Sequence, residues 1–252
     1  MNNFFEYNNI KLFNENCFDI FPKIPDEYFD VIITDPPYFL SNDGVTCQNG
    51  KMVSVNKGNW DKLDENLSLE EFYTNFLTQA RRTLKENGTI FLFGTMHNIY
   101  VLGYLLNKLN FKILNNITWQ KTNPAPNLSC KMFTHSTETI IWAKKSENSK
   151  HFFNYDLMKK ENNGKQMKDV WTSSTTKPSE KKNGKHPTQK PLWLMKRLIL
   201  ASTKENDSIL DCFSGSGTTL LAANELNRKA MGIEMEKDYF DLTIRRFKNL
   251  NK

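Results

Sequence analysis

Short apolar runs alternate with amphipathic segments along most of the chain. Residues 29–35 (FDVIITD) form a β-branched apolar run that stops at a pair of prolines, a pattern typical of a buried strand. Similar runs predict strands at 89–95, 111–120, 138–145, 208–213 and 230–235. Because helical segments separate several of these runs, the pattern predicts an α/β fold with a mostly parallel sheet and helices on both faces.

Helix signals lie between the predicted strands. Ser68 followed by Glu71 forms a capping box, and an apolar face with helical spacing runs from Phe72 to Leu84. Asn87-Gly88 is the expected end of this helix. Further helices are predicted from residue 96 to about 110, from Pro191 onward, at 218–229, and at the end of the chain around Tyr239, Leu242 and Phe247.

Two long segments lack clear periodicity. Residues 39–66 are rich in Asn, Gly, Lys and Ser, and residues 146–185 are polar and rich in lysine. Irregular segments of this length are usually functional or disordered. With 252 residues, 38% of them apolar, the chain is long enough for one large α/β domain. We therefore expect a single domain over 1–252 that carries these two irregular segments.

The positive charge is concentrated in one part of the chain. The net charge is +6, and residues 144–190 hold twelve lysines against five acidic residues, which leaves the rest of the chain at −1. A basic segment suits a polyanionic partner such as nucleic acid, although many lysine-rich stretches are only solvated surface. The positive charge therefore supports binding of nucleic acid only if the basic segment lies beside a candidate site.

The cysteine spacing and the lack of long apolar runs indicate the class of protein and its cellular compartment. Cys17, Cys47, Cys130 and Cys212 are widely scattered, without the spacing of a zinc site or a disulfide framework. There is no signal-peptide pattern and no run of about 18 apolar residues. We expect a soluble, cytoplasmic protein with reduced thiols, no metal and no membrane partner.

A glycine-rich turn is predicted between the strand at 208–213 and the helix at 218–229. Its candidate cofactor-binding residues are Asp211, Phe213, Ser214, Gly215, Ser216, Gly217, Thr218 and Thr219. Glycine lets the backbone approach a ligand, and a helix N-terminus offers free N–H groups. The turn matches neither a Walker loop nor the dinucleotide fingerprint. Glu234 ends the next strand, where a carboxylate can accept hydrogen bonds from a ribose diol. Together they favour a nucleoside cofactor without pyrophosphate.

The tetrapeptide Asp35-Pro36-Pro37-Tyr38 follows a predicted buried strand, where ligands of open α/β sheets bind. An exocyclic amine of a base is a poor nucleophile because its lone pair is delocalised. The Asp35 carboxylate and the Pro36 carbonyl can accept both of its N–H groups and localise the lone pair for in-line methyl transfer. Tyr38 would stack on the base, which must be flipped out or single-stranded. The alternative is a strand that simply ends in proline, with a surface tyrosine.

Residues 35–38 and 213–217 together resemble motifs IV and I of the amino-methyltransferases of DNA, in the order of the β class. Three further segments look like family segments: 58–62, 116–126 and 185–191. The resemblance implies a Rossmann-like methyltransferase fold with a seven-stranded sheet and S-adenosyl-L-methionine as cofactor. It also implies that Thr188, Gln189 and Lys190 help to hold the cofactor, that Asp19 contacts its adenine and that Glu234 contacts its ribose.

The resemblance is strongest to the DpnA-type adenine methylase of GATC restriction systems. It implies methylation of adenine N6 in DNA, GATC as the site, and a cognate restriction endonuclease; family members are often homodimers. Residues 39–66 are then expected to be a lid over the flipped base, and 146–185 a small basic target-recognition insert. Candidate DNA-binding residues are Lys51, Lys57, Trp60, Asn123, Lys165 and Lys168.

Three alternatives stay open at this point. Cytosine-N4 methylation uses the same geometry, although Asp at position 35 favours adenine. RNA or a protein amide is a second substrate class. A catalytically inactive nucleic-acid-binding module is the third, and the intact Asp35, Tyr38, Gly215, Gly217 and Glu234 argue against it. Two positions depart from the family pattern, namely Cys212 in place of proline and Phe39 in place of asparagine.

Overall fold

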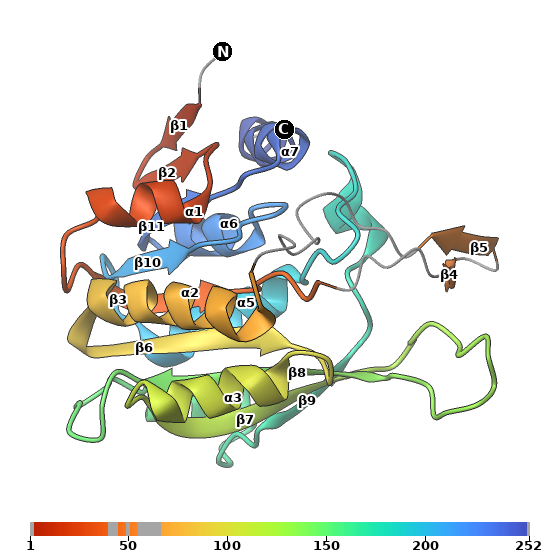
Figure 1. The fold of residues 1–252 in the computed structure, drawn as a ribbon, viewed down its shortest axis with the longest axis horizontal. Helices are drawn as coiled ribbons and strands as arrows, with labels where there is room; N and C mark the ends of the chain where they lie inside the picture. The colour runs from red at the N-terminus through yellow and green to blue at the C-terminus, as the bar shows by residue number, and fades with distance from the viewer. Residues whose placement is uncertain (1–2, 40–44, 49–50, 55–66, 251–252) are drawn as a thin grey trace.

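A large twisted sheet forms the centre of the molecule (Figure 1). The computed structural model describes residues 3–39, 45–48, 51–54 and 67–250. The strands of the sheet are β1 (Phe4–Tyr7), β2 (Ile10–Phe13), β3 (Phe29–Thr34), β6 (Leu84–Gly94), β7 (Lys112–Lys121), β8 (Thr137–Lys144), β9 (Val170–Ser173), β10 (Ser208–Asp211) and β11 (Lys229–Ile233). Their order across the sheet is β1-β2-β11-β10-β3-β6-β8-β7-β9.

The sheet is mostly parallel, as predicted. β2, β11, β10, β3 and β6 form a continuous parallel block, and β7 and β9 are also parallel to each other. β8 runs antiparallel to both of its neighbours, and β1 runs antiparallel to β2. The expected seven strands are too few for the described part of the chain. The additional members are short four-residue strands, whose apolar alternation is too brief to stand out in the sequence.

Helices cover both faces of the sheet, as predicted. They are α1 (Cys17–Ile20), α2 (Leu69–Thr83), α3 (Ile99–Lys108), α4 (Tyr155–Glu161), α5 (Leu192–Ser202), α6 (Thr218–Glu225) and α7 (Lys237–Lys248), with short 3-10 turns η1 (Phe21–Lys23) and η3 (Pro178–Lys181). α2 and α3 lie in front of the sheet in Figure 1. Their apolar faces and that of α1 form one buried cluster, while α5, α6 and α7 contribute to a second cluster on the other face.

The parallel block brings several strand ends to one edge of the sheet. β3 ends before Asp35, β10 ends at Asp211 and β11 ends before Glu234, so these carboxylates share that edge. β8 runs in the opposite direction, and its first residues, beside Gly94 of β6, therefore lie at the same edge. The candidate chemistry of the sequence is thus gathered at the carboxyl ends of the parallel strands.

Three local predictions need correction. The helix that starts with the Ser68–Glu71 capping box ends at Thr83, four residues before Asn87, because Leu84 takes an extended conformation and pairs with Phe29. The segment 39–66 contains an antiparallel hairpin, β4 (Val45–Gln48) and β5 (Lys51–Ser54). The segment 146–185 is not irregular throughout, because it contains α4, β9 and η3.

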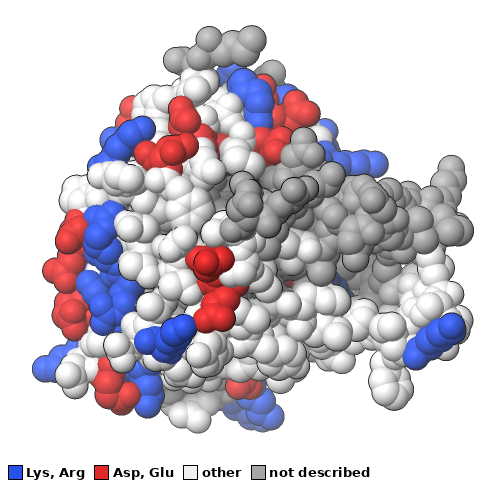
Figure 2. Space-filling view, viewed as in Figure 1, with Lys and Arg blue, Asp and Glu red and all other residues white. Residues whose placement is uncertain are grey.

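The surface opposite the strand ends carries charges of both signs. In Figure 2, Lys and Arg side chains alternate with Asp and Glu along the left margin. Ion pairs there include Arg82 with Asp26 and Lys85 with Asp30. None of the described helices is long and apolar enough to span a membrane.

Candidate active site

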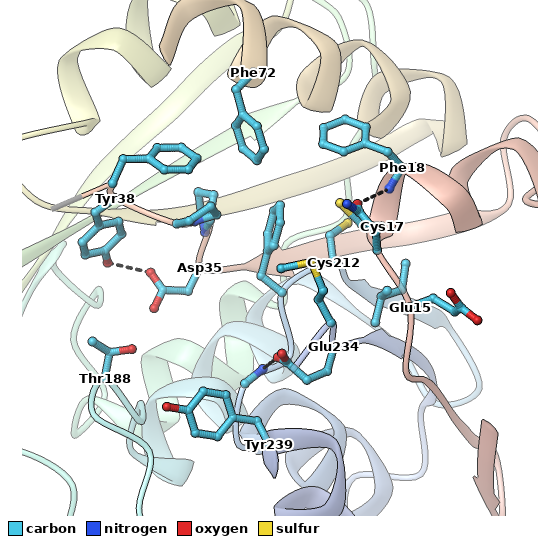
Figure 3. A pocket seen from close by; sticks show the side chains of 18 of the residues that line it. Glu15, Cys17, Phe18, Asp35, Tyr38, Phe72, Thr188, Cys212, Glu234 and Tyr239 are labelled. Carbon is cyan, nitrogen blue, oxygen red and sulfur yellow. Dashed lines mark hydrogen bonds between the residues drawn. The ribbon is translucent and has the colours of Figure 1, made fainter. Parts of the chain in front are cut away.

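A cavity of about 300 Å³ lies at the carboxyl edge of the sheet (Figure 3). Its walls come from segments far apart in the sequence: residues 15–18, residues 35–39 after β3, the turn after β10, and residues 233–235 at the end of β11. The remaining lining residues are Leu67, Phe72 of α2, His186, Thr188 and Tyr239 of α7. This volume is at the lower end of the range of small-molecule sites, about 300–1,000 Å³.

The glycine turn between β10 and α6 is shaped by its backbone. Gly215 and Gly217 have φ angles of 51° and 70°, in the left-handed region that favours glycine. A Cβ at Gly217 would also overlap the side chain of Thr243 on α7. Beside them, the Ser214 hydroxyl is buried and has no hydrogen-bond partner within the described residues. This hydroxyl packs against Gly232 of β11, and Ser214 itself lines the smaller pocket described below.

Glu234 faces the cavity from the end of β11 (Figure 3). Its two carboxylate oxygens accept hydrogen bonds from the backbone N–H groups of Gly215, at 2.6 Å, and Glu236, at 2.8 Å. Burial raises the pKa of Glu234 to about 8, because these backbone donors only partly offset the loss of hydration. The carboxylate is held in place and has lone pairs left for hydroxyl donors.

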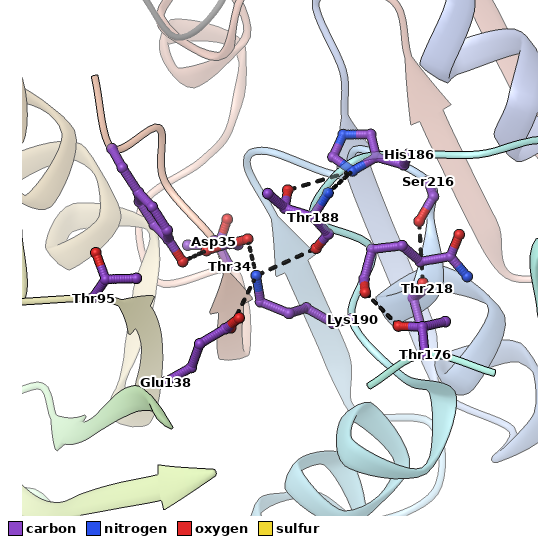
Figure 4. Close-up of polar contacts among 12 residues, drawn as sticks. Thr34, Asp35, Thr95, Glu138, Thr176, His186, Thr188, Lys190, Ser216 and Thr218 are labelled. Carbon is purple, nitrogen blue, oxygen red and sulfur yellow. Dashed lines mark hydrogen bonds and ion pairs between the residues drawn. The ribbon is translucent and has the colours of Figure 1, made fainter. Parts of the chain in front are cut away.

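Asp35 lies at the other end of the cavity, after β3. The Tyr38 hydroxyl donates a hydrogen bond to its Oδ1 at 2.6 Å, and the Lys190 ammonium pairs with its Oδ2 (Figure 4). Tyr38 is buried, and burial together with the charges of Asp35 and Glu138 raises its pKa well above the ordinary value. Tyr38 is therefore neutral, and its hydroxyl keeps its proton while it donates a hydrogen bond to the aspartate.

The two proline carbonyls differ in their partners. The Pro37 carbonyl accepts a hydrogen bond of 2.6 Å from the hydroxyl of Tyr73, a buried residue of α2. Pro36 lines the cavity, and no hydrogen bond to its carbonyl is made by the described residues. The segment is thus fixed through the Pro37 carbonyl, while the Pro36 carbonyl keeps its acceptor capacity.

Residues 185–191 cross the edge of the sheet on the way to α5. His186 is buried against Gly215 and stacks edge-on with Tyr239, with ring centres 4.2 Å apart. Its Nδ1 accepts a hydrogen bond of 3.3 Å from the Thr188 N–H. The Gln189 side chain donates to the Glu180 carbonyl at 3.1 Å. These contacts hold the segment against the glycine turn.

A smaller pocket of about 40 Å³ adjoins the main cavity, with which it shares Asp35, Thr188 and Gly215. Gln189, Lys190, Ser214, Ser216, Thr218 and Thr219 line it. Asp211 also borders it, but its Oδ1 accepts hydrogen bonds from Thr34, at 2.9 Å, and from the Phe213 N–H, at 3.3 Å. Burial raises the pKa of Asp211 to about 6. Asp211 therefore supports the turn from below.

Most of the predicted site residues come together here. The main cavity is lined by Asp35, Pro36, Pro37, Tyr38, Thr188, Phe213, Gly215 and Glu234. Two predicted residues do not line either pocket: Gly217, which is the N-cap of α6, and Asp19, which is exposed on α1. The residues just before Asp19, from Glu15 to Phe18, line the cavity instead.

The predicted DNA-binding residues do not form one group. Asn123 follows β7 at the active-site edge, where its side chain bonds to Thr175. Lys165 and Lys168 are exposed before β9, which starts opposite Thr118 and runs toward the edge, so they lie away from it. The side chain of Lys51, in β5, and all of Lys57 and Trp60 lie outside the described residues.

Two charged residues of the site were missed in the sequence. Glu138 opens β8, and its Oε1 pairs with Lys121 of β7 at 2.5 Å. Its signal was a single acidic residue at the head of an apolar run.

Beyond these strands, the β7–β8 loop (122–136) exposes the apolar side chains of Leu128, Met132 and Phe133, the last with 95% of its surface accessible.

The donor set of the cavity fits S-adenosyl-L-methionine. Aromatic and aliphatic side chains such as Phe18 and Phe213 offer walls for an adenine ring. Glu234 offers acceptors for a ribose diol, and the unpartnered Ser214 hydroxyl lies in the turn where the carboxylate of an amino acid would find N–H groups. Asp35 supplies negative charge at the end where a sulfonium would lie.

Comparison with known proteins agrees with this chemistry. Residues 29–245 match the DNA methylase family N6_N4_Mtase. The chain is 55% identical over 250 residues to the type II methyltransferase M2.LlaDCHI of Lactococcus lactis subsp. cremoris, and 52% identical over 250 residues to M2.DpnII of Streptococcus pneumoniae. These matches cover 99% of this chain, and 92% and 93% of the relatives.

Among solved structures, the M1.HpyAVI–SAM complex superposes with a TM-score of 0.69 at 29% identity, over 96% of this chain and 100% of that one. The fold, the strand-end site and the sequence matches lead to the same assignment. The chain belongs to the DNA methylase family and is an S-adenosyl-L-methionine-dependent DNA methyltransferase.

Proposed function

We propose that this enzyme is a site-specific adenine-N6 methyltransferase that modifies GATC as part of a restriction-modification system. The observation that carries the proposal is the pair of acceptors at the end of β3. Asp35 and Pro36 line one cavity, whose other end holds Glu234. The similarity to type II methyltransferases supports the restriction-modification role.

The cofactor is proposed to lie between the two ends of the cavity. Residues 15–18 and Phe213 would hold its adenine, Glu234 its ribose, and the Ser214–Thr219 turn with Thr188 and Gln189 its amino-acid end. When bound, it supplies an electrophilic methyl group on a sulfonium. The carboxylate of Asp35 favours this cation electrostatically, because both lie in a site largely shielded from water.

The target base is proposed to enter beside Tyr38. One N–H of its exocyclic amine would donate to Asp35 and the other to the Pro36 carbonyl, which leaves the nitrogen lone pair free for attack. Tyr38 would leave the Asp35 carboxylate and stack on the base. A base inside a duplex cannot reach this depth, so it must be flipped or single-stranded.

DNA recognition is proposed to involve the segments that extend from the active-site edge. The β7–β8 loop carries three exposed apolar side chains, and proteins that deform DNA insert such groups between base steps. Asn123 ties the start of this loop to Thr175. We retain residues 39–66 as a lid and 146–185 as a recognition insert, within a single domain. A homodimer, a cognate endonuclease and a cytoplasmic location belong to the same proposal.

A labelling experiment tests the reaction, the base and the site together. The protein is incubated with tritiated S-adenosyl-L-methionine and with duplexes or single strands that contain or lack GATC, and the labelled nucleoside is identified after digestion. We expect N6-methyladenine that depends on GATC, and at least about 10²-fold slower labelling with Asp35→Asn. Label in N4-methylcytosine would overturn the base assignment, and no label in any DNA, with cofactor binding intact, would overturn the function.

A further inference from the structure

Lys190 is more deeply involved with Asp35 than a cofactor ligand needs to be. It is 6% exposed, and its ammonium lies among Asp35 Oδ2, Glu138 Oε2 at 3.4 Å and the Thr188 carbonyl at 3.4 Å (Figure 4). A lysine ammonium has three N–H bonds to donate. Two of them are donated to Asp35 Oδ2 and to the Thr188 carbonyl, and Glu138 Oε2 lies at ion-pair distance, so the ammonium is directed at oxygens of the protein itself.

Glu138 supports Lys190 from the far side. β8 brings it to the active-site edge because Glu138 is paired with Trp119 of β7 in the sheet. Its Oε1 pairs with Lys121. Its Oε2 is buried and makes no hydrogen bond, although Lys190 lies within ion-pair distance. The Oε2 atom of Glu138 therefore attracts the Lys190 ammonium electrostatically. The hydrogen bonds of that ammonium go to Asp35 and the Thr188 carbonyl instead.

The four side chains form a neutral, interlocked set of two carboxylates and two ammonium groups. Burial alone would lower the pKa of Lys190, but Asp35 and Glu138 outweigh it and raise that pKa. Burial would raise the pKa of Glu138, but Lys190 and Lys121 outweigh it and lower that pKa. Lys190 and Glu138 are thus both charged in the resting enzyme.

The two oxygens of Asp35 have partners of different kinds. The Oδ1 partner is the hydroxyl of Tyr38, whose proposed role on the base requires it to move away. The Oδ2 partner is the ammonium of Lys190, which three acceptors hold in place. One oxygen can therefore be released for the target amine while the other keeps its cation.

We propose that Lys190, anchored by Glu138, is a positioning residue for the catalytic carboxylate and not a ligand of the cofactor. It holds Oδ2 throughout the reaction, so that Asp35 keeps its orientation and presents Oδ1 to the amine. The methyl group leaves the sulfonium, which becomes a neutral thioether, and bonds to the amine nitrogen. That nitrogen then loses one proton to Asp35 or water, while Lys190 keeps its own protons. This inference rests on the proposed methyl transfer to an exocyclic amine.

Other ionisable groups that face this set come from the neighbouring elements. Tyr38 lies on the same segment as Asp35, and Tyr73 of α2 acts on Tyr38. Asp211 at the end of β10 is influenced by the charge of Asp35. His186 borders the smaller pocket from the segment before α5. These groups stay unchanged in the variants below, so a change in the rate across the pH range reports on the substituted residue.

The test compares Lys190→Met, Lys190→Arg and Glu138→Gln, with Lys196→Met as control. Lys196 is a half-buried lysine of α5 that pairs with Glu225 and lies outside both pockets. Single-turnover methylation is measured from pH 5 to 9, and the affinity for S-adenosyl-L-methionine is measured by calorimetry. Thermal unfolding of each variant shows whether the fold is intact.

We expect Lys190→Met to lower the single-turnover rate across this pH range by about 10²-fold, the scale on which a misplaced catalytic group loses activity. Lys190→Arg keeps the charge and should lose less of the rate. Glu138→Gln removes the negative charge that faces Lys190 and should lower the rate less than Lys190→Met. Affinity for the cofactor should change by less than about threefold in all of them.

A lower rate with unchanged cofactor affinity and an unchanged unfolding temperature separates positioning from general damage, which would lower all three. A normal rate in Lys190→Met, or cofactor affinity at least about tenfold weaker, would overturn the inference, and the weaker affinity would make Lys190 a cofactor ligand. If Lys190→Met does not fold, Lys190→Arg and Glu138→Gln still decide through rate and affinity. A wild-type enzyme that methylates no DNA would instead overturn the proposed function, and the calorimetry would still report on Lys190.

Discussion

The two ends of the cavity hold a carboxylate in different ways. Glu234 is held by two backbone N–H groups, and burial raises its pKa to about 8. Asp35 is held by the Tyr38 hydroxyl and the Lys190 ammonium. That ammonium also forms an ion pair with a second buried carboxylate, Glu138. Both carboxylates face the same cavity, at the ends of strands in the same parallel block.

The difference follows from what each end is expected to meet. Backbone dipoles offset only part of the hydration that a buried carboxylate loses, whereas a full opposite charge a few ångströms away favours the ionised form strongly. A neutral ribose diol needs only an acceptor that is fixed in place. An amine that becomes cationic beside a sulfonium needs a dependable negative charge. One cavity thus contains a dipole-held end and an ion-held end.

The largest expected effect is a loss of stability at the dipole-held end, where a substitution can disrupt the glycine turn. Gly217→Ala places a Cβ at a φ of 70° and into Thr243, so we expect the free energy of unfolding to fall by about 2–5 kcal/mol, from backbone strain and overpacking together. Gly164→Ala is the matched control, because its φ is 77° and nothing lies within 4 Å of the added Cβ. Urea unfolding of both variants isolates the overlap with Thr243, and equal losses would show that the overlap is relieved.

The next effect removes the charge of the ion-held end. Asp35→Asn keeps the shape but leaves Lys190 without a full counter-charge, so we expect the methylation rate to fall by at least about 10²–10³-fold, the scale of one lost electrostatic contact in a transition state. Cofactor affinity should change far less. Single-turnover labelling and calorimetry measure the two quantities, and a normal rate would remove Asp35 from the chemistry.

The next prediction concerns the pH dependence of cofactor binding at the dipole-held end. Below its pKa of about 8, Glu234 is protonated in the free enzyme, and ribose hydroxyls donate best to the ionised form. Affinity for S-adenosyl-L-methionine should therefore rise with pH up to about 8 and then level off, with a proton released on binding. In Glu234→Gln we expect a flat profile and an affinity lower by about 1.5–3 kcal/mol at pH 8.5. Calorimetry in buffers of different ionisation enthalpy counts the proton, and a flat wild-type profile would contradict the assignment.

The smallest effect separates the two parts of Tyr38. Tyr38→Ala removes the ring, and loss of stacking on the target base should cost about 1–3 kcal/mol in transition-state stabilisation. Tyr38→Phe keeps the ring and loses only the hydroxyl on Asp35, which is not needed once the base has entered. We expect its kcat/KM to stay within a few-fold of the wild type. Equal losses in the two variants would show that the hydroxyl, and not the ring, carries the role.

The dipole-held end could largely be read from the sequence. Gly215, Gly217 and Glu234 follow short strands that are next to each other in the sheet, and backbone geometry makes glycine and a strand-end acid recognisable there. Asp35–Tyr38 was equally clear, because two prolines end the strand. These residues could be predicted because their positions depend on local backbone conformation, which glycine and proline indicate in the sequence.

The ion-held end could be predicted only in part. Asp35 was found, but its ion-pair partner Lys190 lies 155 residues away in the segment before α5, and Glu138, which pairs with Lys190, comes from β8. A single glutamate at the head of an apolar strand looks like an ordinary solvated end until β8 is seen to run antiparallel to β6. The β1–β2 hairpin and β9 were missed for a related reason, since four-residue strands depend on their sheet neighbours more than on their own pattern.

The position of β3 in the sheet has a consequence for synthesis of the enzyme. Ile32 of β3 pairs with Leu210 of β10, about 180 residues later in the chain. At roughly 5–20 residues per second, a ribosome delivers that partner on the order of ten to forty seconds after β3. Until then β3 is an open edge of apolar strand, exposed to wrong pairing. The nascent chain thus contains residues 35–38 long before the glycine turn that is proposed to bind the cofactor has been made. Methylation can begin only once the last third of the chain has been synthesised.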